Sequence, residues 1–545
     1  MICDNLTVSN RRLLFAGQDT VELARQYGTP LYLMDEDRIR ANCRVYTEAF
    51  RRHFGPGAAL YAARPTPSSA IYEIMREEGM GIDVVSSGEI YTALRAGYDL
   101  GQAYFHSNNK TDEDIRYSMD HGIGYFVADN VEEIKAIEAE AARRGIKQRV
   151  LLRLTPGIDP HTYEAIATGK VDSKFGSAIE TGQAEEITLF TLRQPHVELV
   201  GFHCHVGSQV FAEDVFERAA VIMLEFAAHM EKAHGYQTRQ LDLGGGYGVR
   251  YVECDPVLDV DAKVAQVAAA AKGACARLGI ALPEIHMEPG RSIVGDAGLT
   301  LYTVGTVKEI PGYKNYVSVD GGMPDNPRFA LYGASYTCLL ANKLDQPAEF
   351  PCSVVGRCCE SGDIIQEHVL LPGSVGRGDI LAVCTTGAYN YSMASNYNPP
   401  CPGLPLSCSG RQRVLCGQSA GSPWRICAAT TCKNAQGSGP TGGRSLPACR
   451  NRVSDRLPDF WSLLNGSKSR LIRRERQPGR FSFTRSFPSN PFAGRVYWQL
   501  LSSTQLSTCS SSRVTVPSSR TKQGMPREPL ALGPSKTGLL SRRAR

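Results

Sequence analysis

The sequence predicts an α/β protein in which a (β/α)8 barrel, similar to a TIM barrel, precedes a mainly antiparallel β domain. Three observations carry this prediction. Short apolar runs alternate with amphipathic segments between about residues 58 and 291. From about residue 292 the segments become β-rich, with Gly- and Pro-containing turns, and after Asn398 both patterns are lost. Alternating strands and helices are typical of a parallel sheet, whereas consecutive strands are typical of an antiparallel sheet.

The first region contains eight strand-like runs, each short and apolar. They are residues 58–64, 81–86, 103–107, 124–129, 149–155, 198–206, 240–245 and 284–289. Amphipathic segments with apolar residues three to four positions apart lie between several of them, and several of these segments end at Gly. Eight buried strands separated mostly by helices fit a closed barrel. A doubly wound open sheet would also alternate, usually with fewer strands, so it stays the alternative.

The region after the barrel predicts β structure without a long helix. Its strand-rich segments are residues 299–310, 315–322, 352–366 and 379–392. The start of the chain carries a strand candidate at 11–15 and a short helix at 19–28, which we expect to pack with the β domain. The predicted organisation is 1–34 for this N-terminal segment, 35–291 for the barrel, 292–398 for an incomplete β domain and 399–545 for a basic tail.

Charge separates the tail from the rest of the chain. Up to Asn398 there are 36 Lys and Arg against 51 Asp and Glu, and beyond it 24 against 4. The tail is rich in Ser, Arg and Pro and has no sustained apolar face, so we expect disorder because it cannot offset its chain entropy. Three origins stay open: a shift of reading frame after about Asn398 in G+C-rich DNA, a nucleic-acid-binding arm, or an extra folded domain. The first is favoured, because aromatic residues and Lys are too sparse for nucleic-acid binding.

Composition excludes several classes of protein. No stretch approaches the roughly 18 apolar residues of a membrane span. The N-terminus, MICDNLTVSNRRLLF, lacks a basic segment followed by an apolar core, so no secretory signal is expected. The chain has 17 cysteines without C-x-x-C spacing, which indicates reduced thiols and a cytoplasmic location. A membrane protein, a secreted disulfide scaffold and a collagen-like fibre are therefore excluded.

Polar and glycine-rich residues follow the predicted strands, at the face where a barrel builds its site. These segments are Ser86–Glu89, His106–Asn109, His203–Ser208, Gly244–Gly248 and Glu288–Arg291. Three consecutive glycines let backbone N–H groups approach an anion, and Arg291 adds a charged fork. Together with Ser208, they indicate a phosphate pocket, with an ordinary tight turn as the alternative.

Two histidines on one strand, His203 and His205, face the same side and could bind a metal. Carboxylates at ligand-like spacing are missing, so we expect no metal. His203 is expected to pack in the core. His205, nearer the pocket, is the better candidate for lying flat against an aromatic ligand.

Six ordered motifs resemble one family of enzymes. They are HVGSQ, LDLGGGYG, MEPGRS, VDGGMPDNPRFALYG, CCESGD and GAYNYSMASNYN. In these motifs the chain resembles the diaminopimelate decarboxylases over about residues 12–398. That family belongs to the fold-type III pyridoxal-phosphate (PLP) enzymes, with ornithine and arginine decarboxylases. The resemblance implies PLP as cofactor, a homodimer with shared active sites, and a lysine-biosynthesis reaction that converts meso-2,6-diaminopimelate to L-lysine and CO₂.

The resemblance also implies site roles. Glu288 would pair with the pyridine nitrogen, so that the ring accepts electrons as CO₂ leaves, and His205 would stack on the ring. The implied cofactor-binding set is His205, Ser208, Gly244, Gly245, Gly246, Glu288, Pro289, Gly290, Arg291 and Tyr389. The implied substrate-binding set is Arg291, Arg328, Tyr332, Glu360 and Tyr389. Cys359 would reprotonate the carbanionic intermediate from the partner subunit. Glu360 within CESGD favours diaminopimelate over ornithine.

One position departs from the family. The family pattern Y-A-x-K-A places a Schiff-base lysine at the end of the first barrel strand, where this chain reads YAARP, with Arg64 in the lysine position. A guanidinium keeps its charge and is a poor nucleophile. We therefore expect PLP to be held only noncovalently and turnover to be very poor. Lys110, Lys170 and Lys174 lie near strand ends, but nothing directs them to the cofactor. The alternative is an inactive decarboxylase paralogue that binds a ligand or partner, or a product without function.

Overall fold

A computed structural model describes most of the chain before the tail. The described residues are 1–55, 57–159, 171–212 and 214–398, with the backbone of three short strands at 405–408, 413–416 and 425–428. The barrel and the β domain lie within one compact unit, residues 1–438. Among the described residues, no helix is both long and apolar enough to span a membrane.

Eight parallel strands form a closed barrel. They are β5 (Gly57–Ala62), β6 (Gly81–Val84), β7 (Tyr104–Phe105), β8 (Tyr125–Ala128), β9 (Gln148–Thr155), β11 (Val197–His203), β12 (Gln240–Asp242) and β13 (Glu284–Met287). Closure comes from β13, which pairs in parallel with β5, and from β8, which pairs with β9. The prediction of a barrel is thereby confirmed over the open sheet. The short β10 (Ser177–Ala178) extends the sheet beside β9.

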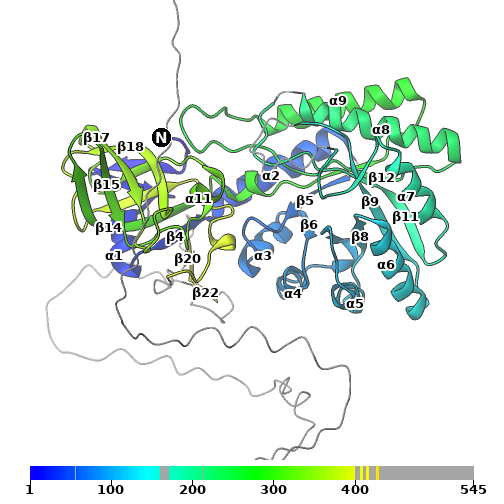
Figure 1. Ribbon diagram of the computed structural model, residues 1–545, viewed down its shortest axis with the longest axis horizontal. Coiled ribbons are helices and arrows are strands. Elements are labelled where there is room, and N and C mark those ends of the chain that lie inside the picture. The colour runs from blue at the N-terminus through cyan, green and yellow to red at the C-terminus, as the bar shows by residue number, and fades with distance from the viewer. Residues whose placement is uncertain are drawn as a thin grey trace, which may run out of the picture. The chain divides into compact units, whose positions relative to one another are not determined.

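Helices surround these strands (Figure 1). They are α2 (Glu36–His53), α3 (Ser69–Glu77), α4 (Ser87–Arg95), α5 (Asp112–Asp120), α6 (Val131–Arg144), α7 (Gln183–Leu192), α8 (Val215–His234) and α9 (Val260–Leu278), with a 3₁₀ turn η1 at Leu100–Gln102. Side chains such as Ser86 and Asn130 accept backbone N–H groups at the helix starts. Gly145 and Gly279 end α6 and α9 in the left-handed conformation.

Alternate strand residues face opposite sides of the barrel wall. Tyr104 and Tyr125 stack inside the barrel, in a small cluster with Leu151. Their neighbours Phe105 and Phe126 belong to the large core between strands and helices. Because side chains alternate between the two sides, the position at which a strand ends determines which of its last side chains faces the mouth of the barrel.

The second sheet is mainly antiparallel, as predicted. Its strands are β14 (Gly298–Ile310), β15 (Lys314–Val319), β16 (Cys338–Leu340), β17 (Ala348–Val355), β18 (Ile364–Pro372) and β19 (Ile380–Cys384), in the order β16-β19-β14-β15-β17-β18. The pairing of β15 with β17 is parallel. Two short helices, α10 (Arg291–Val294) and α11 (Arg328–Tyr332), and the 3₁₀ turn η3 (Tyr391–Met393) complete this region.

The N-terminal residues pack on the second sheet. They form β1 (Leu6–Ser9), β2 (Arg12–Phe15), β3 (Gln18–Asp19), α1 (Thr20–Tyr27) and β4 (Leu31–Asp35). β4 pairs antiparallel with β14, and Leu13, Phe15 and Leu33 share one apolar cluster with Leu299 and Leu301. The exact domain limits at 34, 291 and 398 stay predictions.

The tail predicted for residues 399–545 lies almost entirely outside the described residues. Within it the structure describes β20 (Pro405–Cys408), β21 (Arg413–Cys416) and β22 (Arg425–Ala428), which the sequence did not predict. β20 pairs in parallel with β4. A strand edge offers unpaired backbone groups that a short segment can satisfy whatever its side chains.

Candidate active site

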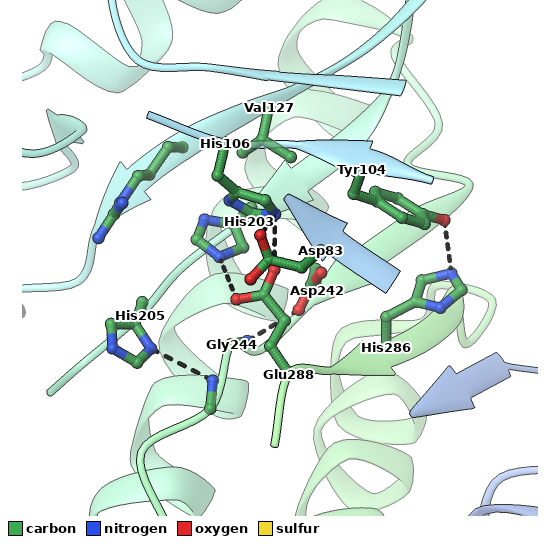
Figure 2. A network of polar contacts seen from close by, with 12 residues as sticks. Asp83, Tyr104, His106, Val127, His203, His205, Asp242, Gly244, His286 and Glu288 are labelled. Carbon is green, nitrogen blue, oxygen red and sulfur yellow. Dashed lines mark hydrogen bonds and ion pairs between the residues drawn. The ribbon is translucent and has the colours of Figure 1, made fainter. Parts of the chain in front are cut away.

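The polar residues that follow the barrel strands meet at the carboxyl ends of those strands. His106, His203, Asp242 and Glu288 are all buried, and their ligand atoms lie within 4.8 Å of one another. Figure 2 shows these side chains, with Asp83 of β6, converging on the Glu288 carboxylate. The strand-end pattern of the sequence therefore marks one shared site.

Glu288 is a buried carboxylate held by two histidines. Its Oε1 lies 2.7 Å from His106 Nε2 and its Oε2 lies 3.3 Å from His203 Nε2. Burial opposes ionisation, but the two histidines hold the pKa of Glu288 well below its ordinary value. Burial lowers the pKa of both imidazoles. We infer an anionic carboxylate that accepts hydrogen bonds from neutral imidazole N–H groups.

Asp242 lies beside Glu288, and its pKa is shifted in the opposite direction. Burial and the neighbouring Glu288 raise the pKa of Asp242 well above its ordinary value, which favours the neutral form of its carboxyl. Its Oδ1 accepts the backbone N–H of Gly244 at 2.8 Å, and it offers a carboxyl oxygen within 4.8 Å of the Glu288 carboxylate. Asp242 thus links the carboxylate to the first residue of the glycine run.

The glycine run has no room for side chains. A Cβ on Gly245 would lie 2.0 Å from the carbonyl oxygen of Glu288, and one on Gly246 would lie 2.0 Å from that of Gly207. Gly244 has a φ of 67°, which favours glycine. The Gly245 N–H donates to His205 Nδ1 at 3.2 Å, so the His205 proton is on Nε2 and the ring is fixed against the turn.

Arg291 lies beside this turn, at the start of α10. Its Nε and Nη2 donate to Ser208 Oγ at 3.2 and 3.0 Å, and its Nη1 donates to the Tyr251 hydroxyl at 2.7 Å. Its Cζ lies 4.7 Å from the ring centroid of Tyr389. The Tyr389 backbone N–H in turn donates to the Pro65 carbonyl. The Ser208 hydroxyl, the Arg291 guanidinium and the Tyr389 ring therefore lie together.

Two further residues of the implied cofactor set connect β13 to β5. The Pro289 carbonyl accepts the Ala62 N–H at 3.1 Å. A Cβ on Gly290 would lie 2.9 Å from Pro65 Cγ. The close approach holds the end of β5, and with it Arg64, against the glycine-rich side of the site.

Arg64 is paired with a buried acid. Its Nη1 lies 2.8 and 3.0 Å from the two carboxylate oxygens of Asp83. Burial raises the pKa of Asp83 to about 6, although Arg64 and His106 favour the ionised form. Asp83 in turn raises the pKa of the guanidinium. Arg64 therefore stays cationic at the end of β5.

The two candidate lysines that the structure describes have their contacts elsewhere. The Lys110 side chain is 0% exposed, and its Nζ donates to the carbonyls of Ser107 and Val127 and to the Glu133 carboxylate. All three ammonium protons are thus used. Lys174 is exposed, with Nζ 4.8 Å from the Phe175 ring centroid. Lys170 lies outside the described residues.

The implied substrate residues divide into two groups. Arg328 is buried, with Nη1 2.7 Å from the Tyr336 hydroxyl and Cζ 4.8 Å from the Tyr251 ring centroid. Tyr251 therefore joins Arg328 to Arg291, and both arginines lower its pKa against the effect of burial. Tyr332 ends α11 and is half-buried.

Cys359 and Glu360 form the second group. Both side chains are exposed, in the turn between β17 and β18. The Glu360 carboxylate accepts the N–H of Gly362, within its own turn, at 3.1 Å. The chain itself thus presents these two residues at its surface.

Sequence reasoning missed several residues of the site. Asp83, Asp242 and Tyr251 were given no role, and His203, expected only to pack, donates to Glu288. A usable signal was present: Asp83 and Asp242 are acids in short strands that are otherwise uncharged and mostly buried. Buried acids in strands require partners.

Comparison with known proteins agrees with this geometry. The family model described as pyridoxal-dependent decarboxylase, pyridoxal binding domain, matches residues 36–295. A diaminopimelate decarboxylase of Bacillus subtilis is 44% identical over 386 residues, covering 71% of this chain and 88% of that protein. One from Mycobacterium tuberculosis is 39% identical, covering 70% and 87%.

Solved structures of diaminopimelate decarboxylases have a similar fold. The crystal structure of the diaminopimelate decarboxylase from M. jannaschii in complex with L-lysine has a TM-score of 0.69 at 31% identity, covering 75% of this chain and 94% of that chain. The Helicobacter pylori enzyme, also complexed with L-lysine, has a TM-score of 0.65 at 31% identity, covering 74% and 95%. The chain therefore belongs to the diaminopimelate decarboxylases, a family of carboxy-lyases whose cofactor is pyridoxal 5′-phosphate.

Proposed function

We propose that the chain binds PLP noncovalently at the carboxyl end of the barrel. Ser208, Arg291 and the glycine turn would hold the phosphate, assisted by Tyr389, with His205 against the ring and Glu288 at its nitrogen. The turn supports this proposal, since a Cβ on Gly245 would lie 2.0 Å from a carbonyl oxygen, so that only a glycine backbone lets a phosphate approach this closely. When bound, PLP supplies an electron sink for decarboxylation.

The polar cluster would control the proton on the ring nitrogen. An anionic Glu288, kept ionised by His106 and His203, favours a protonated ring nitrogen. The raised pKa of Asp242 favours its neutral form, which would leave one negative charge on the pair of Asp242 and Glu288. Burial strengthens the pairing because water does not screen it.

The presence of Arg64 after β5 is the observation on which the proposed level of decarboxylase activity rests. The family reaction would convert meso-diaminopimelate to L-lysine and CO₂, and two relatives bind L-lysine in their crystal structures. In this chain the residue at the end of β5 is a guanidinium paired with Asp83 at 2.8 Å. It is a poor nucleophile at any working pH. We propose residual decarboxylation at most, or an inactive paralogue that retains the ligand site.

We also propose a homodimer with shared sites in the cytoplasm. The exposure of Cys359 and Glu360 supports the dimer, since residues that act on substrate would have to enter the site of a second copy. Ten described cysteines are free thiols, which supports a reducing location.

Two measurements on the full chain test the proposal. Equilibrium dialysis should show one PLP bound per chain, and Arg291→Ala should weaken this binding. Release of L-lysine from meso-diaminopimelate should be far slower for the wild type than for R64K. Equal rates would contradict the role of Arg64, whereas absence of PLP binding would contradict the site itself.

A further inference from the structure

A second cluster of metal-ligating side chains lies on the helical layer outside the barrel wall. Glu185 is in the first turn of α7, and His229 and His234 are near the end of α8. Each offers one ligand atom, and these atoms lie within 4.8 Å of one another. The cluster is separate in sequence and in its elements from the Glu288 site.

The two imidazoles converge on a single carboxylate. His229 Nε2 lies 3.1 Å from Glu185 Oε2, and His234 Nε2 lies 2.6 Å from Glu185 Oε1. The rings are nearly perpendicular, at 83°, with centroids 6.0 Å apart. The cluster therefore places a carboxylate and two ring nitrogens close enough to share one ion.

Solvent can reach this point. The side chains of Glu185, His229 and His234 are 37%, 50% and 28% exposed. An ion could therefore enter without any opening of the core. Partial exposure also lets each imidazole move its proton to Nδ1, toward water, which frees the Nε2 lone pair for a ligand bond.

We propose that Glu185, His229 and His234 form a site for a divalent transition metal, best suited to Zn²⁺, that links α7 to α8. Two imidazole nitrogens and one carboxylate oxygen are a zinc donor set, with water in the fourth position. Zinc–ligand bonds of about 2.0–2.2 Å in a tetrahedron place neighbouring ligand atoms roughly 3.3 Å apart. Small rotations of the three side chains would bring their ligand atoms, which lie within 4.8 Å of one another, to this spacing. Mg²⁺ and Ca²⁺ are disfavoured because they prefer oxygen ligands.

Zinc uptake by the full chain tests the proposal. The exposed thiols are first blocked by alkylation, because cysteines also bind zinc. Zn²⁺ is then titrated against a chromophoric chelator for the wild type, E185Q, H229Q and H234Q. His196→Gln is the matched control, since His196 pairs with Glu138 at 2.8 Å without a second imidazole in the pair.

The expected result is one equivalent of zinc that is present in the wild type and H196Q and lost in the three cluster variants. Co²⁺ in place of Zn²⁺ should give the visible absorption of a tetrahedral site in the same two proteins only. Equal zinc uptake by the wild type and H229Q would overturn the proposal, as would a loss of the equivalent in H196Q. Circular dichroism of each variant shows that the fold is kept.

Discussion

Replacement of Glu288 by Gln tests how the polar cluster is held together. The substitution keeps the shape of the side chain and removes its charge. In the wild type, the Glu288 carboxylate lies 2.7 Å from His106 Nε2 and 3.3 Å from His203 Nε2. Hydrogen bonds to a charged group contribute about 1.5–3 kcal/mol and neutral ones about 0.5–1.5 kcal/mol, so each bond loses roughly 1 kcal/mol. The amide also turns an N–H₂ group toward one imidazole, where a buried mismatch costs about 1–3 kcal/mol. We expect a total destabilisation of about 3–5 kcal/mol.

The pH dependence of this loss follows from the lowered pKa of Glu288. A carboxyl with a lowered pKa in the folded state contributes stability above its unfolded pKa, near 4.3, and loses it as pH falls through the folded value. The gap between wild type and E288Q should therefore stay constant from about pH 5.5 to 8 and narrow only below about pH 4.5.

Urea unfolding at several pH values measures the gap. Glu284→Gln is the control, because Glu284 is on the same strand, 41% exposed and 3.7 Å from His286. It should change stability by less than about 0.5 kcal/mol. An E288Q protein as stable as the wild type at pH 7, or a gap that widens on acidification, would refute an ionised Glu288 held by two imidazoles.

Three further predictions concern the same site. Arg291→Ala should weaken PLP binding about 10–100-fold in fluorescence titration, through the loss of charge-assisted hydrogen bonds, while the exposed Arg239→Ala should not. Gly245→Ala should lower stability by about 2–3 kcal/mol, because its Cβ would lie 2.0 Å from a carbonyl oxygen, whereas Gly273→Ala, with no atom within 4 Å, should not destabilise. Asp242→Asn should change the free energy of unfolding by less than about 1 kcal/mol, since the raised pKa favours a neutral carboxyl in the wild type; a large loss would contradict a protonated Asp242.

Much of the site could be read from the sequence because a parallel barrel brings its strand ends to one face. The glycine run, Glu288 and Arg291 follow β12 and β13, and the structure joins them to Ser208 after β11. Asp83 and Asp242 were missed because strand residues alternate between the barrel interior and the helices. An apolar run alone does not reveal which of the two alternating sets of side chains faces the barrel interior.

The fold was also predicted only in part, because the barrel and the β domain were expected but some of their elements were not. The helix α7 was missed because its sequence, QAEEITLFTL, has few polar positions on its later turns and starts at Gly182 without a side-chain cap. The parallel pairing of β15 with β17 was missed because connection length alone gives no strand order. The roles of Cys359 and Glu360 stay predictions, since a second copy of the chain would have to supply their surroundings.

The most direct measurement is borohydride reduction of the full chain incubated with PLP, followed by peptide mass mapping. We expect no pyridoxyl group on the wild type and one on residue 64 of R64K, because an amine at that position forms the reducible covalent link. A pyridoxyl group on any lysine of the wild type, bound in stoichiometric amount, would contradict the central claim that Arg64 leaves the cofactor noncovalently held.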